Sequence, residues 1–234
     1  MSNSAFHLIE TGTRLADAAA TVERLLDIAA DRAQVQVELI VRTDSRAARR
    51  FLSLTRFGAN VVLELHTSAE TTSRFLDRLD PLIPADQRRG LDPDVPIGVS
   101  DGEGGFWLAL SEEDTDAVGT LDQLPVVETE VSVDDLPLAQ FDWSVIPPIG
   151  GPERTSVHWA VGCWPAVPEL GLEPTAKHTG IELSVNATGL WDLAPAPPGY
   201  HLYVTTRDSD AAEAHGPVIA ERVGRTVIGP IEYC

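Results

Sequence analysis

The sequence predicts an α+β fold: a mixed β-sheet with three N-terminal helices, one C-terminal helix and no transmembrane segment. Helical and strand-like hydrophobic patterns alternate from the N-terminus to Ile83, and short apolar runs separated by proline and glycine fill much of the remainder. A last helical pattern stands near the C-terminus. The chain has 234 residues, 43% of them hydrophobic, and is therefore long enough to bury a sizeable core.

The first predicted element is an amphipathic helix over residues 11–32. Leu15, Ala18, Val22 and Leu25 recur at spacings of three and four and form one apolar stripe. Threonines at the start of this segment are typical N-caps, and charged residues occupy the opposite face. The pattern therefore predicts a helix that covers a core with one side.

Strands and helices then alternate as far as Ile83. Residues 34–42 alternate between apolar and polar side chains, as a strand with one buried face does. Asp44 and Ser68 each precede a helical pattern, and Gly58 and Pro81 end these patterns. The further predicted elements are a helix over 44–57, a strand over 60–67 and a helix over 68–80.

The middle of the chain predicts short strands. Residues 95–100 and 105–110 flank an Asp-Gly-Glu-Gly turn, which is a hairpin signal. Residues 111–116 resemble the acidic start of a helix, and residues 126–133 alternate as a strand with an acidic face. The Pro-Pro and Gly-Gly pairs within 141–151 are typical of a connector.

The C-terminal third predicts three strands, a helix and a closing strand. Gly224 follows the helical pattern and is a typical helix stop. A strand, a helix and a strand in this order are consistent with a right-handed crossover. The expected elements are strands over 156–161, 180–185 and 200–206, a helix over 210–223 and a strand over 225–231.

A single domain over residues 1–234 is expected, with 1–146 and 152–234 as the possible subdivision. The N-terminal sequence lacks the basic and apolar regions of a signal peptide, and no stretch approaches the roughly 20 apolar residues of a membrane span. The two cysteines, Cys163 and Cys234, are too few for a disulfide framework, and a bridge between them stays open. The expected location is the cytoplasm.

Negative charge is concentrated in the middle of the chain. The whole span between Arg89 and Arg154 is rich in Asp and Glu and contains no Lys or Arg, in a chain of formal charge −19. Ordinary surfaces mix charges of both signs. A concentrated negative field attracts basic partners and repels nucleic acid and anionic membranes. The pattern therefore predicts a docking surface for a basic protein, with neither nucleic acid nor membrane as a partner.

The predicted partner-binding surface consists of acidic residues and one tryptophan. Trp143 belongs to it because an aromatic side chain flanked by acids near a loop is typical of an interface anchor. A competing interpretation pairs these acids with arginines of the predicted helix over 44–57. The predicted residues are Asp101, Glu103, Glu112, Glu113, Asp114, Asp116, Glu128, Glu130, Asp134, Asp135, Asp142 and Trp143.

Sequence motifs for catalysis, metal binding and phosphate binding are absent. The six histidines are scattered without a CxxC or HxxxH pair, and the acids over 101–116 lack the order of a calcium loop. The sequence contains no nucleophile elbow and no phosphate-binding loop. We therefore predict no catalytic residue, no metal and no cofactor.

The expected function is that of a non-enzymatic acidic protein that binds a basic protein in the bacterial cytoplasm. Its most concrete form is an immunity protein or antitoxin that inhibits a basic toxin such as a nuclease, because an acidic surface can occupy a cleft built for phosphate. The alternative is an enzyme that assembles its site around His158, Cys163 and carboxylates and acts on a small molecule. A scaffold subunit with an apolar contact patch is a third class. The sequence predicts no particular oligomeric state.

Overall fold

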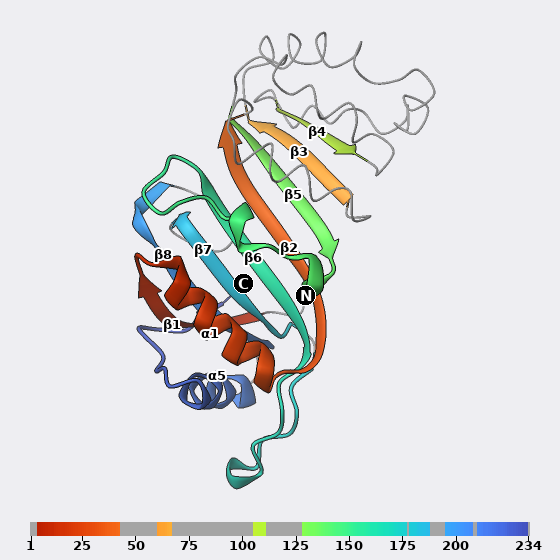
Figure 1. Ribbon diagram of the computed structural model, residues 1–234. Coiled ribbons are helices and arrows are strands. Elements are labelled where there is room, and N and C mark those ends of the chain that lie inside the picture. The colour runs from red at the N-terminus through yellow and green to blue at the C-terminus, as the bar shows by residue number, and fades with distance from the viewer. Residues whose placement is uncertain are drawn as a thin grey trace. The chain divides into compact units, whose positions relative to one another are not determined.

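The computed structural model describes residues 4–42, 60–66, 105–110, 128–176, 178–187, 195–207 and 210–233 (Figure 1). The chain divides into two compact units. The first consists of Met1–Gln36 and Pro137–Cys234, and the second of Val37–Leu136. Strand β2 (Ala30–Arg42) begins in the first unit and ends in the second.

An antiparallel sheet is the framework of the first unit (Figure 1). Its strands lie side by side in the order β6 (Arg154–Cys163), β7 (Gly180–Ala187), β8 (Pro195–Arg207), β1 (Ser4–Gly12) and β9 (Glu232–Tyr233). Every position of β7 is buried, so both faces of this central strand are covered. β1 pairs with β8 along its length, with a bulge between Leu8 and Glu10.

Two helices pack against this sheet. α1 (Leu15–Ile28) contacts β1, β7 and β8, and α5 (Asp210–Arg222) contacts β1 and β8. Gly224, at a φ of 72°, follows α5 in the left-handed region, as a helix stop does. The buried residues of α1 recur at the predicted helical spacing: Ala18, Thr21, Val22 and Leu25.

The C-terminal strand, helix and strand form a crossover. β8 and β9 both run antiparallel to β1, which lies between them, so they run parallel to each other and α5 connects them. The predicted closing strand over 225–231 is wrong, because those residues form no strand and only Glu232–Tyr233 pair with β1. Before that pairing, the Ile228 amide donates a hydrogen bond of 2.7 Å to the Leu8 carbonyl.

The connector predicted over 141–151 is confirmed as irregular, with one short helical turn at Trp143–Val145. Asn186 of β7 forms hydrogen bonds with the C-terminal end of this connector. The Gly150 amide donates to Asn186 Oδ1 at 3.0 Å, and Asn186 Nδ2 donates to the carbonyls of Pro148 and Glu153 at 3.1 and 3.0 Å. Asn186 adopts a φ of 57°, which asparagine tolerates better than most residues.

Three strands are described in the second unit. β3 (Asn60–His66) lies between β4 (Gly105–Leu110) and β5 (Glu128–Leu136), and both pairings are antiparallel. The three strands confirm the predictions of a strand over 60–67, one over 105–110 and one over 126–133, and β5 continues past residue 133 to Leu136. The predicted strand over 95–100, the turn over 101–104 and the helix start over 111–116 lie outside the described residues.

The predicted fold class, a mixed sheet with three N-terminal helices, is wrong. Every strand pairing whose register is described is antiparallel. The described N-terminal residues contain one helix, α1, which is shorter than predicted because Thr11 and Gly12 belong to β1 and residues 30–32 belong to β2. The segments 44–57 and 68–80, predicted as the other two helices, lie outside the described residues. Strand β1 lacks clean alternation, since consecutive residues are buried on both of its faces.

Candidate functional site

The predicted partner-binding residues fall into three groups in the structure. Asp101, Glu103, Glu112, Glu113, Asp114 and Asp116 lie outside the described residues. Glu128, Glu130, Asp134 and Asp135 are positions of β5 in the second unit. Asp142 and Trp143 lie in the connector of the first unit.

The register of β3 and β5 brings acidic positions together. Glu64 of β3 pairs with Glu130 of β5, and Asn60 pairs with Asp134. Positions two apart in a strand share a face, so Glu128, Glu130 and Asp134 occupy one face of β5. None of the residues of β3, β4 and β5 is Lys or Arg. Like charges that face each other directly across two strands destabilise a sheet. The pairing of Glu64 with Glu130 is therefore stabilised by other interactions and not by these two carboxylates.

Asp142 and Trp143 have local packing roles. The exposed Asp142 carboxylate accepts hydrogen bonds of 2.8 Å from the amide and from the hydroxyl of Ser144. The half-buried Trp143 ring lies 5.6 Å from the ring of the buried Trp159 and 5.5 Å from that of Phe141. Trp143 therefore packs against the core on one side, and its predicted role as an interface anchor stays a prediction.

A cluster of a serine, a glutamate and a histidine lies on the first unit's sheet. Register pairs Ser156 with Ser184 and His158 with Glu182, so Ser156, His158 and Glu182 share a face. Ser156 Oγ donates to Glu182 Oε1 at 2.6 Å, and His158 Nδ1 lies 2.5 Å from Glu182 Oε2. Glu182 is only 3% exposed, so both carboxylate oxygens are engaged inside the protein. We call these three residues the carboxylate cluster.

Gly180 makes room for the carboxylate cluster. A Cβ atom at this position would lie 2.5 Å from His158 Cε1, 3.0 Å from His158 Nε2 and 2.9 Å from the Trp159 carbonyl oxygen. The imidazole therefore lies directly over the glycine. His158 Nδ1 faces Glu182, and the side chain as a whole is 29% exposed.

Further polar residues share this sheet face. Register places His201 opposite Ser184, Tyr203 opposite Glu182 and Thr205 opposite Gly180. Burial, together with the charge of Glu232, raises the pKa of Tyr203 to about 12. His201 Nδ1 and Thr205 Oγ1 are buried and have no hydrogen-bond partner within the described part of the chain. Buried polar atoms without protein partners often mark sites for water or ligand.

The carboxylate cluster has the chemistry of an oriented base, not that of a nucleophilic triad. In a Ser-His-Asp triad the hydroxyl donates to the imidazole, whereas Ser156 donates to the carboxylate. A carboxylate that accepts the Nδ1 proton fixes the tautomer, so Nε2 of a neutral imidazole carries the lone pair. Cys163 is not part of the cluster; its thiol donates to the Trp164 carbonyl oxygen at 3.1 Å.

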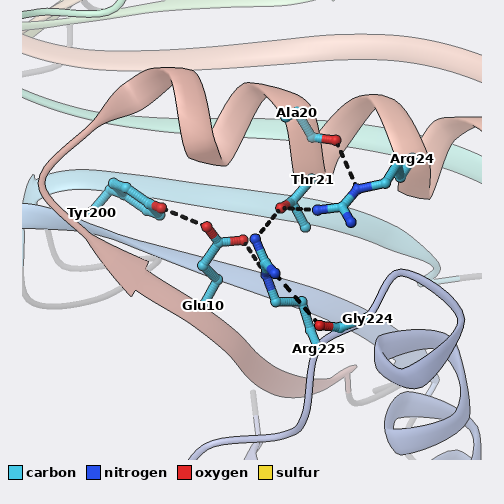
Figure 2. Close-up of polar contacts among 7 residues, drawn as sticks. All are labelled: Glu10, Ala20, Thr21, Arg24, Tyr200, Gly224 and Arg225. Carbon is cyan, nitrogen blue, oxygen red and sulfur yellow. Dashed lines mark hydrogen bonds and ion pairs between the residues drawn. The ribbon is translucent and has the colours of Figure 1, made fainter.

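A second polar network joins the two helices to the sheet (Figure 2). Arg225, just after α5, donates from Nε to Glu10 Oε2 at 2.8 Å and from Nη2 to Thr21 Oγ1 at 3.0 Å. The Tyr200 hydroxyl donates to Glu10 Oε1 at 2.7 Å. Arg24 donates to the same Thr21 oxygen at 3.0 Å. The network spans β1, β8, α1 and the residue after Gly224.

Electrostatics favour the ionised form of Glu10. Burial raises the pKa of this carboxyl, but the hydrogen bonds it accepts, first of all from Arg225, outweigh burial and lower the net pKa. Burial and the neighbouring Glu10 carboxylate raise the pKa of the Tyr200 phenol. Because every member has a partner within the network, we assign it a structural role and not a catalytic one.

Sequence reasoning missed Ser156 and Glu182, although a signal for both exists. Ser156 and His158 are two apart in a strand and so share a face, and Glu182 interrupts an otherwise apolar strand. A carboxylate within a buried strand needs partners. Which residues are its partners follows only from the register between β6 and β7.

The chain matches no protein-family model, no curated protein and no solved structure. Within the described ranges, no group of three or more His, Cys, Asp or Glu side chains is arranged to hold a metal ion. In the same part of the chain, no helix is long and apolar enough to cross a membrane. The function is therefore argued from the residues themselves.

Proposed function

We propose that this protein is a non-enzymatic, acidic protein-binding protein whose partner is basic. The observation that carries the proposal is the register of β3 and β5, which pairs Glu64 with Glu130 in strands that contain no Lys or Arg. Opposed carboxylates are unfavourable for the isolated sheet. Cationic side chains of a basic partner, placed next to these carboxylates, would offset the repulsion between them and would themselves be attracted to both.

The proposal extends to an intracellular inhibitor of a basic toxin, such as a nuclease. Enzymes that act on nucleic acid present positively charged clefts, and an acidic surface competes for such a cleft by charge and shape alone. The acid-rich span between Arg89 and Arg154, which has no Lys or Arg, supports this class of partner. A cytoplasmic location follows from the same proposal.

Neutralising two acids of β5 is expected to weaken partner capture in a salt-dependent way. We expect the double variant Glu128→Gln and Glu130→Gln to retain several-fold less basic protein from a source-cell extract at about 0.05 M salt, and the difference to shrink at about 0.5 M, where screening is stronger. The measurement is a pull-down at both salt concentrations, quantified by mass spectrometry.

A matched control removes two exposed acids of the first unit, Glu169 and Glu173, by substitution with Gln. Both double variants change the net charge equally, so general electrostatics affect them alike. Equal capture by the two variants would place the docking surface elsewhere. Absence of any captured basic protein at low salt would refute the proposed function.

A further inference from the structure

His158 directs one ring nitrogen to a buried carboxylate and the other to solvent. Nδ1 lies 2.5 Å from Oε2 of Glu182, whose side chain is only 3% exposed. Nε2 makes no hydrogen bond within the described part of the chain and is not a buried atom, so it reaches solvent. The imidazole is therefore held at one nitrogen and open at the other.

The carboxylate determines which nitrogen of the neutral imidazole carries the proton. An ionised carboxylate accepts hydrogen bonds and donates none, so the proton stays on Nδ1 and the lone pair on Nε2. Ser156 donates to the other oxygen of Glu182 at 2.6 Å and so holds the carboxylate in place. Gly180 lies directly under the ring of His158. The ring thus has a fixed orientation, and Nε2 is its nucleophilic atom.

Burial separates His158 from most histidines whose burial the structure describes. His7 and His215 are 0% exposed, and Nδ1 of His201 is buried. His178 is exposed and serves as a reference for an accessible imidazole. A reagent in water therefore meets His158 and His178 before it meets His7 or His215.

We propose that His158 is an acylation site, whose Nε2 atom takes the acyl group of a small, uncharged, activated ester or anhydride. The Nε2 lone pair attacks the carbonyl carbon, and the bond from that carbon to the leaving oxygen breaks, so the leaving group departs with the electron pair. The Nδ1 proton moves to the Glu182 carboxylate. The product is a neutral acylimidazole that accepts a hydrogen bond from a carboxylic acid.

The charge of the chain and the position of the site define the donor. A formal charge of −19 repels anions, so an uncharged donor is favoured over an acyl phosphate. Nε2 is open to solvent, so a small donor reaches it without a cavity. Glu182 and Ser156 are positioning residues, because they touch the imidazole or its carboxylate and not the donor. The site lies in the first unit and is independent of the acidic strand β5.

The test measures acylation of the full-length protein by diethyl pyrocarbonate, an uncharged anhydride that transfers an ethoxycarbonyl group to imidazole. The reaction runs at about pH 8, where a free imidazole is mostly neutral, and peptide mass spectrometry gives the rate at each histidine. We expect His158 to react at least as fast as the more exposed His178. Nitrogen NMR of the ¹⁵N-labelled product is expected to place the group on Nε2. His7 and His215 stay unmodified as long as the protein is folded.

Glu182→Gln is expected to lower the rate at His158 by about tenfold or more and to leave the rate at His178 unchanged. The amide cannot take the Nδ1 proton, and proton transfer to a positioned side chain contributes roughly 10²- to 10⁴-fold to a rate. Glu10→Gln is the matched control, since it neutralises another carboxylate, 8% exposed, that binds Arg225 and Tyr200 instead of a histidine.

A rate at His158 that falls in the Glu182 variant and persists in the Glu10 variant would support the proposal. Equal rates in the two variants would overturn it. In the unsubstituted protein, a slower reaction at His158 than at His178, or a product on Nδ1, would overturn it as well, and this comparison does not depend on the folding of any variant.

Discussion

Replacing Gly216 by alanine is expected to destabilise the protein by about 2 kcal/mol, within the range of about 1–3 kcal/mol that overpacking of a buried site costs. A Cβ atom at this position of α5 would lie 2.5 Å from Nδ1 of His7 and closer still to Cγ and Cδ2 of the same ring. The His7 ring is 0% exposed, so it cannot move into solvent, and either α5 or β1 must shift. This cost exceeds the gain of about 1 kcal/mol that alanine brings to a helix interior.

A double variant separates the clash from other effects of the substitution. In His7→Ala with Gly216→Ala, the added methyl group enters the space that the imidazole leaves. We expect the losses of the two single variants to be clearly non-additive, with a coupling of about 1 kcal/mol or more. Urea denaturation of the four proteins measures this coupling. If the losses in unfolding free energy of the two single variants simply add, Gly216 of α5 does not pack directly against the His7 ring.

Removing the Arg225 side chain is expected to cost about 2 kcal/mol at neutral pH, less than the roughly 3–5 kcal/mol of a fully buried ion pair, because solvent screens this one in part. Arg225→Ala leaves the Glu10 carboxylate, only 8% exposed, with hydroxyl donors but no cation. The guanidinium is 31% exposed, which is the source of the screening. Arg222→Ala is the matched control, since Arg222 is exposed and makes one long contact, 3.5 Å, with the Ala166 carbonyl.

The same network predicts how stability depends on pH in acid. The pKa of Glu10 is lowered in the folded protein, so its stabilising contribution is complete above the unfolded carboxyl value of about 4.3. The contribution is lost as pH falls through the lower, folded pKa. In Arg225→Ala, burial without the cation raises the pKa of Glu10, so we expect acid unfolding to begin at a higher pH. Denaturation midpoints measured across the acid range test this shift; coincident curves would contradict it.

At alkaline pH the network is expected to lose stability as pH rises, opposite to the direction of the acid loss. Folding raises the pKa of Tyr200, mainly by burial and by its hydrogen bond to Glu10. The contribution of a group with a raised pKa is complete below the unfolded value, about 10 for a phenol, and is lost as pH rises through the folded one. We expect Tyr200→Phe to flatten this alkaline loss, which urea midpoints measured from neutral to alkaline pH would detect.

The elements that the sequence predicted correctly have a signal within their own residues, and β7 is among them although both of its faces are covered. Alternation predicted the strand at 34–42, an apolar run the strand at 60–67, and a hairpin signal the strand at 105–110. An apolar stripe at helical spacing predicted α1. The N-terminal strand β1 was missed, because α5 and α1 cover one of its faces, residues are buried on the other as well, and its hydrophobic pattern is therefore continuous. Two-residue β9 has no local pattern and exists only as a partner of β1.

Local sequence thus determined the charge distribution, the amphipathic helix and most strands, since each depends on residues within a few positions of one another. Tertiary structure alone decided which polar residues meet. Ser156 contacts Glu182 across 26 positions, and Arg225 contacts Glu10 across 215. The register between β6 and β7 and the return of the chain past α5 create these contacts. Register depends on how whole strands bury both faces at once, and no single segment of the chain contains that information.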